Sequence, residues 1–293
     1  MKARRAGFAG SWYPAQAGAC EKEIQLFLKD PAIRNVPEGS TFGGIVPHAG
    51  WYYSGSIACN VIHVLKNGPK VDTLVLFGMH LHPFSSNYIM AKGSWETPFG
   101  EIDIDQDLAS SLLDQFPFIV EDADEFTQDN TIELQLPFIK YFFKDARIVP
   151  IGVPPKKGSL EIGKAVSSAA NKMGKRIKII GSTDLTHYGS NYDFTPKGTG
   201  SKAVQWVKGD NDKRLIDAVC AMEPDRVIQE GLTHQNACCA GAAAAAIAAA
   251  KALGAQGASV IGYSTSFDKS PAESFVGYVG IVFRSSERGA SHP

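Results

Sequence analysis

Short apolar runs without polar alternation separate segments that have a helical pattern, and this alternation constrains the fold of the chain most strongly. A strand without a polar face is typical of the centre of a sheet that is covered on both sides. We therefore predict an α/β fold with a mostly parallel central sheet and helices on both faces. The apolar runs span residues 42–47, 72–78, 147–153, 177–182, 259–264 and 275–283. The helical segments span residues 54–65, 105–116, 131–143, 159–173, 211–221 and 240–253.

The length of 293 residues suits one large domain or two small ones. Residues 189–200 (GSNYDFTPKGTG) have the composition of a surface loop and not that of a linker between domains. We predict a single domain over residues 1–284 and a disordered tail over residues 285–293. Alanine dominates residues 240–253, and Gly254 is suited to end that helix.

Charge and hydropathy exclude several classes of function. The chain has 29 Lys and Arg against 30 Asp and Glu, a net charge of −1, so we expect no nucleic-acid or membrane partner. The start, MKARRAGFAG, is too short and polar for a signal peptide, and the apolar stretch 240–250 is too short to span a bilayer. Five cysteines, an odd number, argue against a disulfide framework. We predict a cytoplasmic protein with reduced thiols; the composition carries no information on its oligomeric state.

Residues that can bind metal follow three of the predicted strands. His48 lies in the motif PHAGW after the first strand, and His80 lies in MHLH after the second. Asp184 and His187 lie in TDLTH after the fourth. Ligands bind at the carboxyl edge of open α/β sheets, so we expect these side chains to converge there. A single loop histidine is more often solvated than a ligand, so the prediction depends on all three motifs together.

Two adjacent cysteines, Cys238 and Cys239, open the alanine-rich helix. A thiol at a helix N-terminus meets unpaired N–H groups and the positive end of the helix dipole, which favours the thiolate that binds metal. One alternative is a small buried side chain that fills a tight contact. Another is a redox-active pair, which is disfavoured because a bridge between neighbouring residues is strained.

Several motifs together resemble those of the Memo family, also called AmmeMemoRadiSam system protein B. Each motif alone is weak, but together they run in order over nearly the whole chain. The family is similar in fold to the class III extradiol ring-cleaving dioxygenases, which use non-haem iron. The motifs are AGSWYP at 9–14, PHAG at 47–50, Thr97-Pro98, Ile132-Glu133 with QLP at 135–137, STD at 182–184 with His187, and Asn236 through Cys239.

The resemblance implies a mononuclear metal site with two histidines and one cysteine as ligands. His48 matches the PHAG histidine. The second histidine of the family lies in the pattern G-P-[SN]-H, whereas this chain reads Gly78-Met79-His80. Counting back from Thr97-Pro98 places one deletion in this segment, and His80 then matches the family histidine as the second ligand. His82 is the neighbouring alternative. Cys239 matches the ligand cysteine because it lies three residues after the motif asparagine.

The same resemblance assigns catalytic roles to Asp184 and His187, which match a D-x-x-H pair that lines the site. The chain departs from the family at Asn130, where a histidine is usual. Asparagine forms hydrogen bonds but exchanges no proton near neutral pH, which puts an acid–base role at this position in doubt. Tyr52 and Tyr53, with the tryptophan before them, either wall the pocket or pack at the helix start.

The expected donor set favours two functions from different classes. Imidazole suits iron, copper and zinc, and thiolate favours softer metals, so we expect iron or copper, with zinc as a further option. The first hypothesis is a redox enzyme, similar to an oxygenase, that acts on a small organic substrate. The second is a non-catalytic protein that reuses the dioxygenase-like pocket for a peptide or small ligand, and a zinc hydrolase is a weaker third. A metal site beside Asp184 and His187 favours the first hypothesis, because a protein that only binds a ligand needs neither a metal nor acid–base residues.

Overall fold

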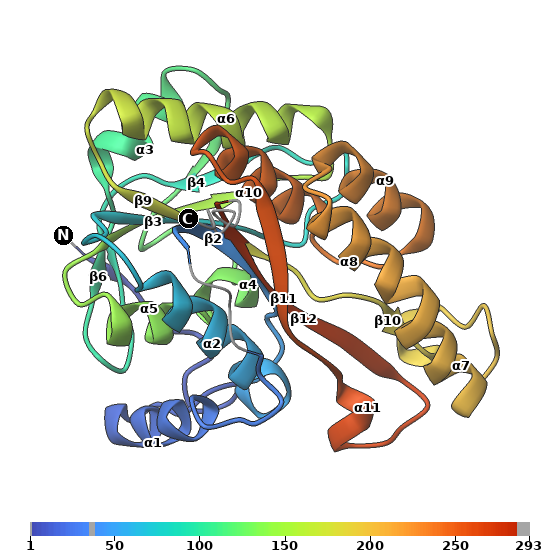
Figure 1. Ribbon diagram of the computed structural model, residues 1–293. Helices are drawn as coiled ribbons and strands as arrows, with labels where there is room; N and C mark the ends of the chain where they lie inside the picture. Colours follow the sequence, from blue (N-terminus) through green and yellow to red (C-terminus); the bar gives the residue numbers. More distant parts are fainter. Residues whose placement is uncertain (1, 35–38, 286–293) are drawn as a thin grey trace, which may run out of the picture.

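A mixed sheet crosses the structure, and helices cover both of its faces (Figure 1). The computed structural model describes residues 2–34 and 39–285; the predicted disordered tail lies, apart from Ser285, outside the described residues. The strands lie side by side in the order β10 (His187–Tyr188), β12 (Phe275–Arg284), β2 (Thr41–Val46), β9 (Ile177–Ser182), β3 (Thr73–Gly78), β8 (Arg147–Gly152), β4 (Tyr88–Met90) and β7 (Ile119–Glu121), and β11 (Gly257–Thr265) pairs with β12. A small separate sheet consists of β1 (Ala3–Arg4), β5 (Ser94–Trp95) and β6 (Ile102–Asp103).

The centre of the main sheet is parallel, and its flanks contain antiparallel pairs. Strands β2, β9, β3 and β8 run parallel to one another. By contrast, β12 runs antiparallel to both β2 and β11, and β4 runs antiparallel to β8. The predicted α/β class, with a central sheet between helices, is confirmed, and the parallel pairing is concentrated in the strands that both layers cover.

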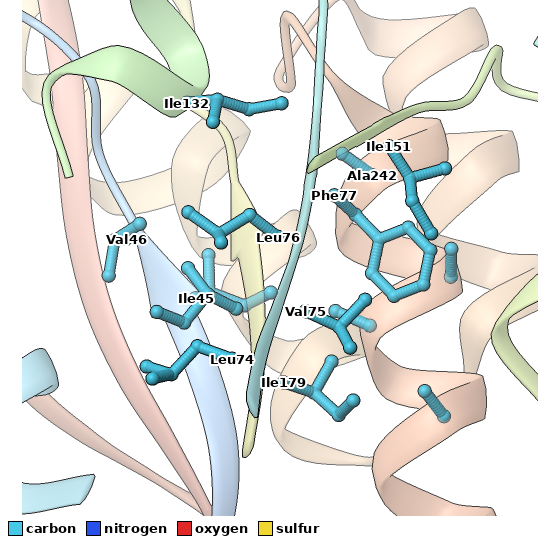
Figure 2. Packing of buried hydrophobic residues seen from close by; sticks show 14 of the residues in the cluster. Ile45, Val46, Leu74, Val75, Leu76, Phe77, Ile132, Ile151, Ile179 and Ala242 are labelled. Carbon is cyan, nitrogen blue, oxygen red and sulfur yellow. The ribbon is translucent and has the colours of Figure 1, made fainter. Parts of the chain in front are cut away.

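The central strands are apolar throughout because both of their faces are buried. Every residue of β3 is buried, as is every residue of β9. Figure 2 shows Leu74 and Leu76 beside Ile45 on one side of the sheet, while Val75 and Phe77 point to the other side, towards the helix that carries Ala242. This arrangement explains why the sequence shows no polar alternation in these runs.

One layer of helices contains α3 (Gln106–Leu113), α6 (Lys157–Lys172), α8 (Asp212–Cys220), α9 (Pro224–His234) and α10 (Ala240–Ala252), and the other contains α1 (Ala17–Phe27), α2 (Ser56–Leu65) and α5 (Leu136–Phe142) (Figure 1). Shorter elements are α4 (Asn130–Glu133), α7 (Ser201–Trp206), α11 (Ser266–Lys269), the π-helices η1 (Trp51–Gly55) and η3 (Val207–Asn211), and the 3₁₀-helix η2 (Ser190–Tyr192). Within residues 2–34 and 39–285, no helix combines the length and the apolar character that a membrane crossing requires.

The six predicted strands are all present, and the helix predictions differ from the structure mainly at the predicted helix 131–143. That segment splits into α4 and α5. Gln135 lies at the break, and its side-chain amide donates to the Pro47 carbonyl at the end of β2. Pro137 has no backbone N–H to donate to residue 133, so it ends the hydrogen bonding of α4, and the Gln135 contact holds this break against β2. Helices α1, α7 and α9 and the short edge strands were not predicted; α7 has only six residues, but α9 is clearly amphipathic and has Pro224 in its first turn.

The alanine-rich helix α10 is buried over most of its length, between α6, α9 and the sheet. Its small side chains permit very close approach. A methyl group built on Gly163 of α6 would lie 2.3 Å from the Ala245 carbonyl oxygen, and one built on Gly181 of β9 would lie 2.7 Å from the Ala246 side chain. The position of α10, and of the two cysteines before it, therefore depends on small residues at these contacts.

We expect Gly163→Ala to lower the free energy of unfolding by about 3 kcal/mol, the upper end of overpacking costs, because the added methyl meets backbone that cannot yield. Gly158 lies in the same helix with open space around its Cα. Gly158→Ala is the matched control and should change stability by about 0.5 kcal/mol or less. Urea denaturation followed by circular dichroism measures both, and equal midpoints for the two variants would refute the close-packing explanation.

Candidate metal centre

Three adjacent parallel strands deliver the predicted polar residues to one edge of the sheet. The register pairs Val46 of β2 with Ser182 of β9, and β3 lies on the other side of β9. His48, Asp184 and His80 each stand two residues beyond the end of one of these strands. The rings of His48 and His80 consequently meet edge to face, with their centroids 4.9 Å apart.

Hydrogen bonds fix the orientation of the buried His48 ring. Its Nδ1 lies 2.9 Å from the Ser182 hydroxyl, which donates its own hydrogen to the Thr131 carbonyl. The Ser182 oxygen must therefore accept from Nδ1–H, which leaves Nε2 as the atom that can bind a metal. The His48 backbone N–H donates to the Asp184 carboxylate at 2.7 Å. The Asp184 side chain thus secures the loop that carries His48.

The loop that carries His80 has an unusual backbone. Met79 has φ +71, a left-handed conformation that non-glycine residues rarely adopt. Its N–H donates to the Thr131 hydroxyl at 2.8 Å, and a side chain on Gly78 would clash with the same hydroxyl. The start of α4 therefore holds the end of β3 and directs His80 towards His48. His82 is exposed, and its ring contacts Phe84 instead of joining the two histidines.

Both cysteines reach the same place from the N-terminus of α10. Asn236 anchors the preceding turn, because its amide donates to the Asn211 carbonyl. The Cys239 N–H donates to the Thr183 hydroxyl at 3.1 Å, and the Asp184 N–H donates to the Cys238 sulfur at 3.3 Å. Thr183 and Asp184, which follow β9, therefore hold the two cysteines through hydrogen bonds that involve backbone N–H groups.

The result is a compact set of metal donors. The ligand atoms of His48, His80, Cys238 and Cys239 all lie within 4.8 Å of one another. The two sulfurs are 3.7 Å apart, and the Cys238 sulfur lies 3.2 Å from His48 Nε2. Ligand atoms around one tetrahedral ion are about 3.3–3.8 Å apart when each lies about 2.0–2.3 Å from it. The two sulfur separations are close to this range and the whole set lies within 4.8 Å, so these four side chains form a candidate site for one metal ion.

Without a bound ion, the charges around the cluster favour a Cys238 thiolate beside a protonated His48. Burial opposes ionisation of Cys238, but hydrogen bonding with Cys239 and the charge of His48 outweigh it and hold the Cys238 pKa well below its usual value. Burial raises the pKa of Cys239, and the neighbouring sulfur raises it further. Burial lowers the pKa of His48, but Asp184 and Cys238 overcome this and raise it to about 9. An ion that binds here would therefore displace protons from the ligands.

A pocket of about 540 Å³ opens beside the two histidines. Cavities of this size accommodate small organic molecules. The described residues that line it include both histidines but neither cysteine. Its aromatic lining is Trp12, Tyr52, Tyr53, Tyr192 and Tyr278, and its polar lining includes Asn130, Asp184 and His187. Trp51 is instead buried in the core, where its ring stacks on Phe138.

His187 and Asp184 have different surroundings although both line the pocket. His187 Nδ1 lies 3.1 Å from the Leu185 carbonyl, so Nδ1 carries the hydrogen and Nε2 is left for another partner. Asp184 is only 4% exposed, and burial raises its pKa although the charge of His48 opposes this. Asn130 donates to the His48 carbonyl at 3.0 Å, so it supports the loop of His48.

A buried carboxylate behind the pocket supports the segment that carries these residues. Asp212 accepts hydrogen bonds from the Thr186 N–H and hydroxyl, and from the Tyr263 hydroxyl. Sequence reasoning missed Asp212, Tyr192 and Tyr278, because no motif around them distinguishes them from ordinary residues. It considered Cys238 as half of a redox pair and placed it off the ligand position by counting along the motif, although its position beside Cys239 was the available signal.

Comparisons with known proteins agree with the fold and with the motifs. Residues 4–282 match the model of a family described as Memo-like protein. The chain is 34% identical over 290 residues to a MEMO1 family protein of Methanosarcina acetivorans, covering 96% of this chain and 99% of that protein. It is 31% identical to one of Pyrococcus furiosus, covering 96% and 99%. The crystal structure of an uncharacterized protein from Escherichia coli K12 shares the fold, with a TM-score of 0.50 and 10% sequence identity. The match covers 76% of this chain and 91% of that one.

The buried Asp212 should make stability depend on pH. Burial raises its pKa from 3.8 to about 6 although its hydrogen bonds oppose this. Between these values the folded protein keeps a proton that the unfolded chain releases, so stability falls as pH rises through this window and is constant above it. Two pKa units correspond to roughly 3 kcal/mol. We expect Asp212→Asn to remove this component.

Urea denaturation of the wild type and of Asp212→Asn between pH 4 and pH 7.5 measures the effect. The difference in the free energy of unfolding between the two proteins should change with pH. Asp210→Asn, an exposed carboxylate two residues earlier, is the matched control and should give a constant difference. Parallel stability curves for wild type and Asp212→Asn would contradict the prediction.

Proposed function

Because this chain belongs to the Memo-like protein family, we propose that it is a metal-dependent redox enzyme that acts on a small organic substrate in the pocket beside His48 and His80. One observation carries the proposal: two imidazoles that line a pocket large enough for such a substrate lie within 4.8 Å of two thiols. In this proposal His48, His80 and Cys239 hold one ion. Iron or copper would supply one-electron redox chemistry there, and zinc would not.

The protein contributes a preformed donor set. The Ser182 hydroxyl holds the His48 ring through Nδ1, so that Nε2 is directed to the ion without reorganisation. The left-handed backbone at Met79 directs His80 to the same point. Cys239 is 3% exposed at the start of α10, so water has little access to its sulfur. These features favour tight binding of one ion and protect the thiolate from side reactions.

The pocket lining suits an aromatic or otherwise flat organic molecule. Trp12, Tyr52 and Tyr192 offer ring faces and edges around the opening, and aromatic rings bind flat apolar groups through such contacts. No lysine or arginine is among the described residues that line the pocket. The ion and the imidazoles would therefore be the main partners for an oxygen anion on the substrate.

His187 is the proposed acid–base residue. Its Nδ1 is held by the Leu185 carbonyl and its ring packs edge to face on Tyr192, so Nε2 can give a proton to a pocket ligand or take one from it. The Asp184 carboxylate accepts a hydrogen bond from the His48 backbone N–H. Its charge, close to His48 Nε2, favours the protonated form of the His48 ring. The two residues would thus control proton transfer and ligand orientation.

The second candidate is a protein that binds a peptide or small ligand without turnover. The observation that favours it is the exposure of aromatic rings around the opening, with Trp12 40% and Tyr52 63% exposed. Exposed aromatic residues are frequent in binding surfaces. The presence of a metal donor set beside an acid–base histidine favours the enzyme.

We expect His48→Ala and His80→Ala each to weaken metal binding by roughly tenfold or more, because each removes a donor that the fold holds in place. Protein purified without oxygen and reconstituted with Fe(II) or copper would be analysed for metal by mass spectrometry. His82→Ala is the matched control and should retain the wild-type metal content. Loss of metal in His82→Ala, or a wild type that binds no ion, would overturn this assignment.

We expect His187→Ala to keep its metal but to lower metal-dependent oxygen consumption by roughly 10²–10⁴-fold, the usual contribution of a positioned acid–base group. The assay compares the iron, copper and zinc forms with a panel of catechols and with cell extract. Tyr192→Phe, which keeps the ring against His187, is the control. Absence of oxygen consumption in the iron and copper forms of the wild type would favour the binding protein.

A further inference from the structure

We propose that Cys238 is a fourth protein ligand, so that this chain holds its ion with two imidazoles and two thiolates. The inference rests on the proposed function only in assuming that the site binds a metal. It differs from the set of two histidines and one cysteine that the family motifs imply. The observation behind it is that the Cys238 sulfur lies inside the donor cluster and not beside it.

Distances support four donors around one centre. The separation of 3.7 Å between the Cys238 and Cys239 sulfurs matches the roughly 3.8 Å expected of two thiolates on one tetrahedral ion. The 3.2 Å from the Cys238 sulfur to His48 Nε2 is close to the roughly 3.6 Å expected of a thiolate and an imidazole on the same ion. The Cys238 sulfur thus already lies among the donor atoms that the other three residues offer.

The contacts of the Cys238 sulfur also suit a thiolate ligand. The Asp184 N–H donates to it at 3.3 Å, while the Thr183 hydroxyl, 3.7 Å away, donates its hydrogen to the Asp184 carbonyl. Backbone N–H groups of this kind commonly contact thiolates on metals, where they stabilise the negative charge. A core cysteine that only fills space would have apolar neighbours instead.

A disulfide between the two cysteines fits the structure less well. Consecutive Cα atoms are about 3.8 Å apart, shorter than the usual separation of about 4.4–6.8 Å across a disulfide. The Cys239 N–H is bound to the Thr183 hydroxyl, and Cys239 is the residue before the first turn of α10. A bridge would have to disturb this anchored backbone, whereas metal binding by both sulfurs would not.

The arrangement leaves a side of the ion open to the pocket. The described residues that line the pocket include His48 and His80 but neither cysteine. The thiolates therefore occupy the buried side, between the end of β9 and α10, and the imidazoles face the substrate side. An ion held by these four residues would be reached by a substrate from the side of the imidazoles, since four-coordinate sites can expand to five.

A second thiolate has a consequence for metal choice. Two sulfur and two nitrogen donors in tetrahedral geometry favour soft ions such as Cu(I) and zinc over Fe(II). Of the two redox metals considered above, the four-donor site therefore favours copper. The preference should depend on Cys238 specifically, because removing it restores the harder three-donor set.

The test counts sulfur ligands directly. Wild-type protein would be loaded with Co(II), a spectroscopic probe for zinc and copper sites, and studied by sulfur-to-cobalt charge-transfer absorption and X-ray absorption spectroscopy. We expect two sulfur ligands in the wild type, and roughly half the charge-transfer intensity in each of Cys238→Ser and Cys239→Ser. Cys220→Ser removes a thiol far from the cluster in sequence and should leave both signals unchanged.

The outcomes separate the two proposals. One sulfur ligand in the wild type, with Cys238→Ser unchanged, overturns the fourth ligand and leaves the proposed function intact. A wild type that binds none of Co(II), zinc, Cu(I) and Fe(II) overturns both. The wild-type sulfur count needs no variant, so it decides the question even if a serine variant fails to fold.

A competition experiment tests the consequence for metal choice. Cys238→Ser should weaken Cu(I) binding by at least roughly tenfold and should weaken Fe(II) binding much less. Affinities measured against chelators under nitrogen give both values. An equal loss for the two ions would overturn the predicted preference for soft metals.

Discussion

The parallel pairing of β2, β9 and β3 fixes the position of the groups at the candidate metal centre. Hydrogen bonds between the backbones align Val46 with Ser182, so neighbouring strands end at the same edge of the sheet. Each chain then continues for two residues before it presents His48, Asp184 or His80. The main chain, and not contacts between the functional side chains, therefore brings these residues together. Such a site can change its ligands without changing its scaffold.

The cysteines depend on a different constraint, the close packing of α10. An alanine helix buries little apolar area per residue, but it can approach its neighbours more closely than a helix of larger side chains. Gly163 of α6 and Gly181 of β9 accept this approach where a side chain would clash. The N-terminus of α10 consequently lies against the end of β9, where the two thiols reach the histidines. Stability and site geometry are linked through these small residues.

Two buried hydroxyl residues connect the cluster to the start of α4 through hydrogen bonds. Ser182 and Thr131 are fully buried, and they form a continuous series of hydrogen bonds from the His48 ring to the start of α4. Such networks offset the cost of removing polar groups from water and also hold side chains in one orientation. The donor atoms are thus rigid on their buried side, while the aromatic pocket on the other side is open to a ligand.

The sequence by itself determined the α/β class, the six principal strands and the strand-end positions of His48, His80 and Asp184, because apolar periodicity and strand ends are local properties. Its motifs also identified the family that the comparisons confirm. The sequence did not predict the antiparallel flanks of the sheet, nor the break between α4 and α5 where Gln135 binds the end of β2. Nor did it place the Cys238 sulfur beside the His48 ring. Cys238 and His48 are separated by 190 positions, and only the packing of α10 on the sheet brings that sulfur to the imidazole. Tertiary structure decided this point because a local pattern encodes where a strand or helix lies but not which distant side chain it will meet.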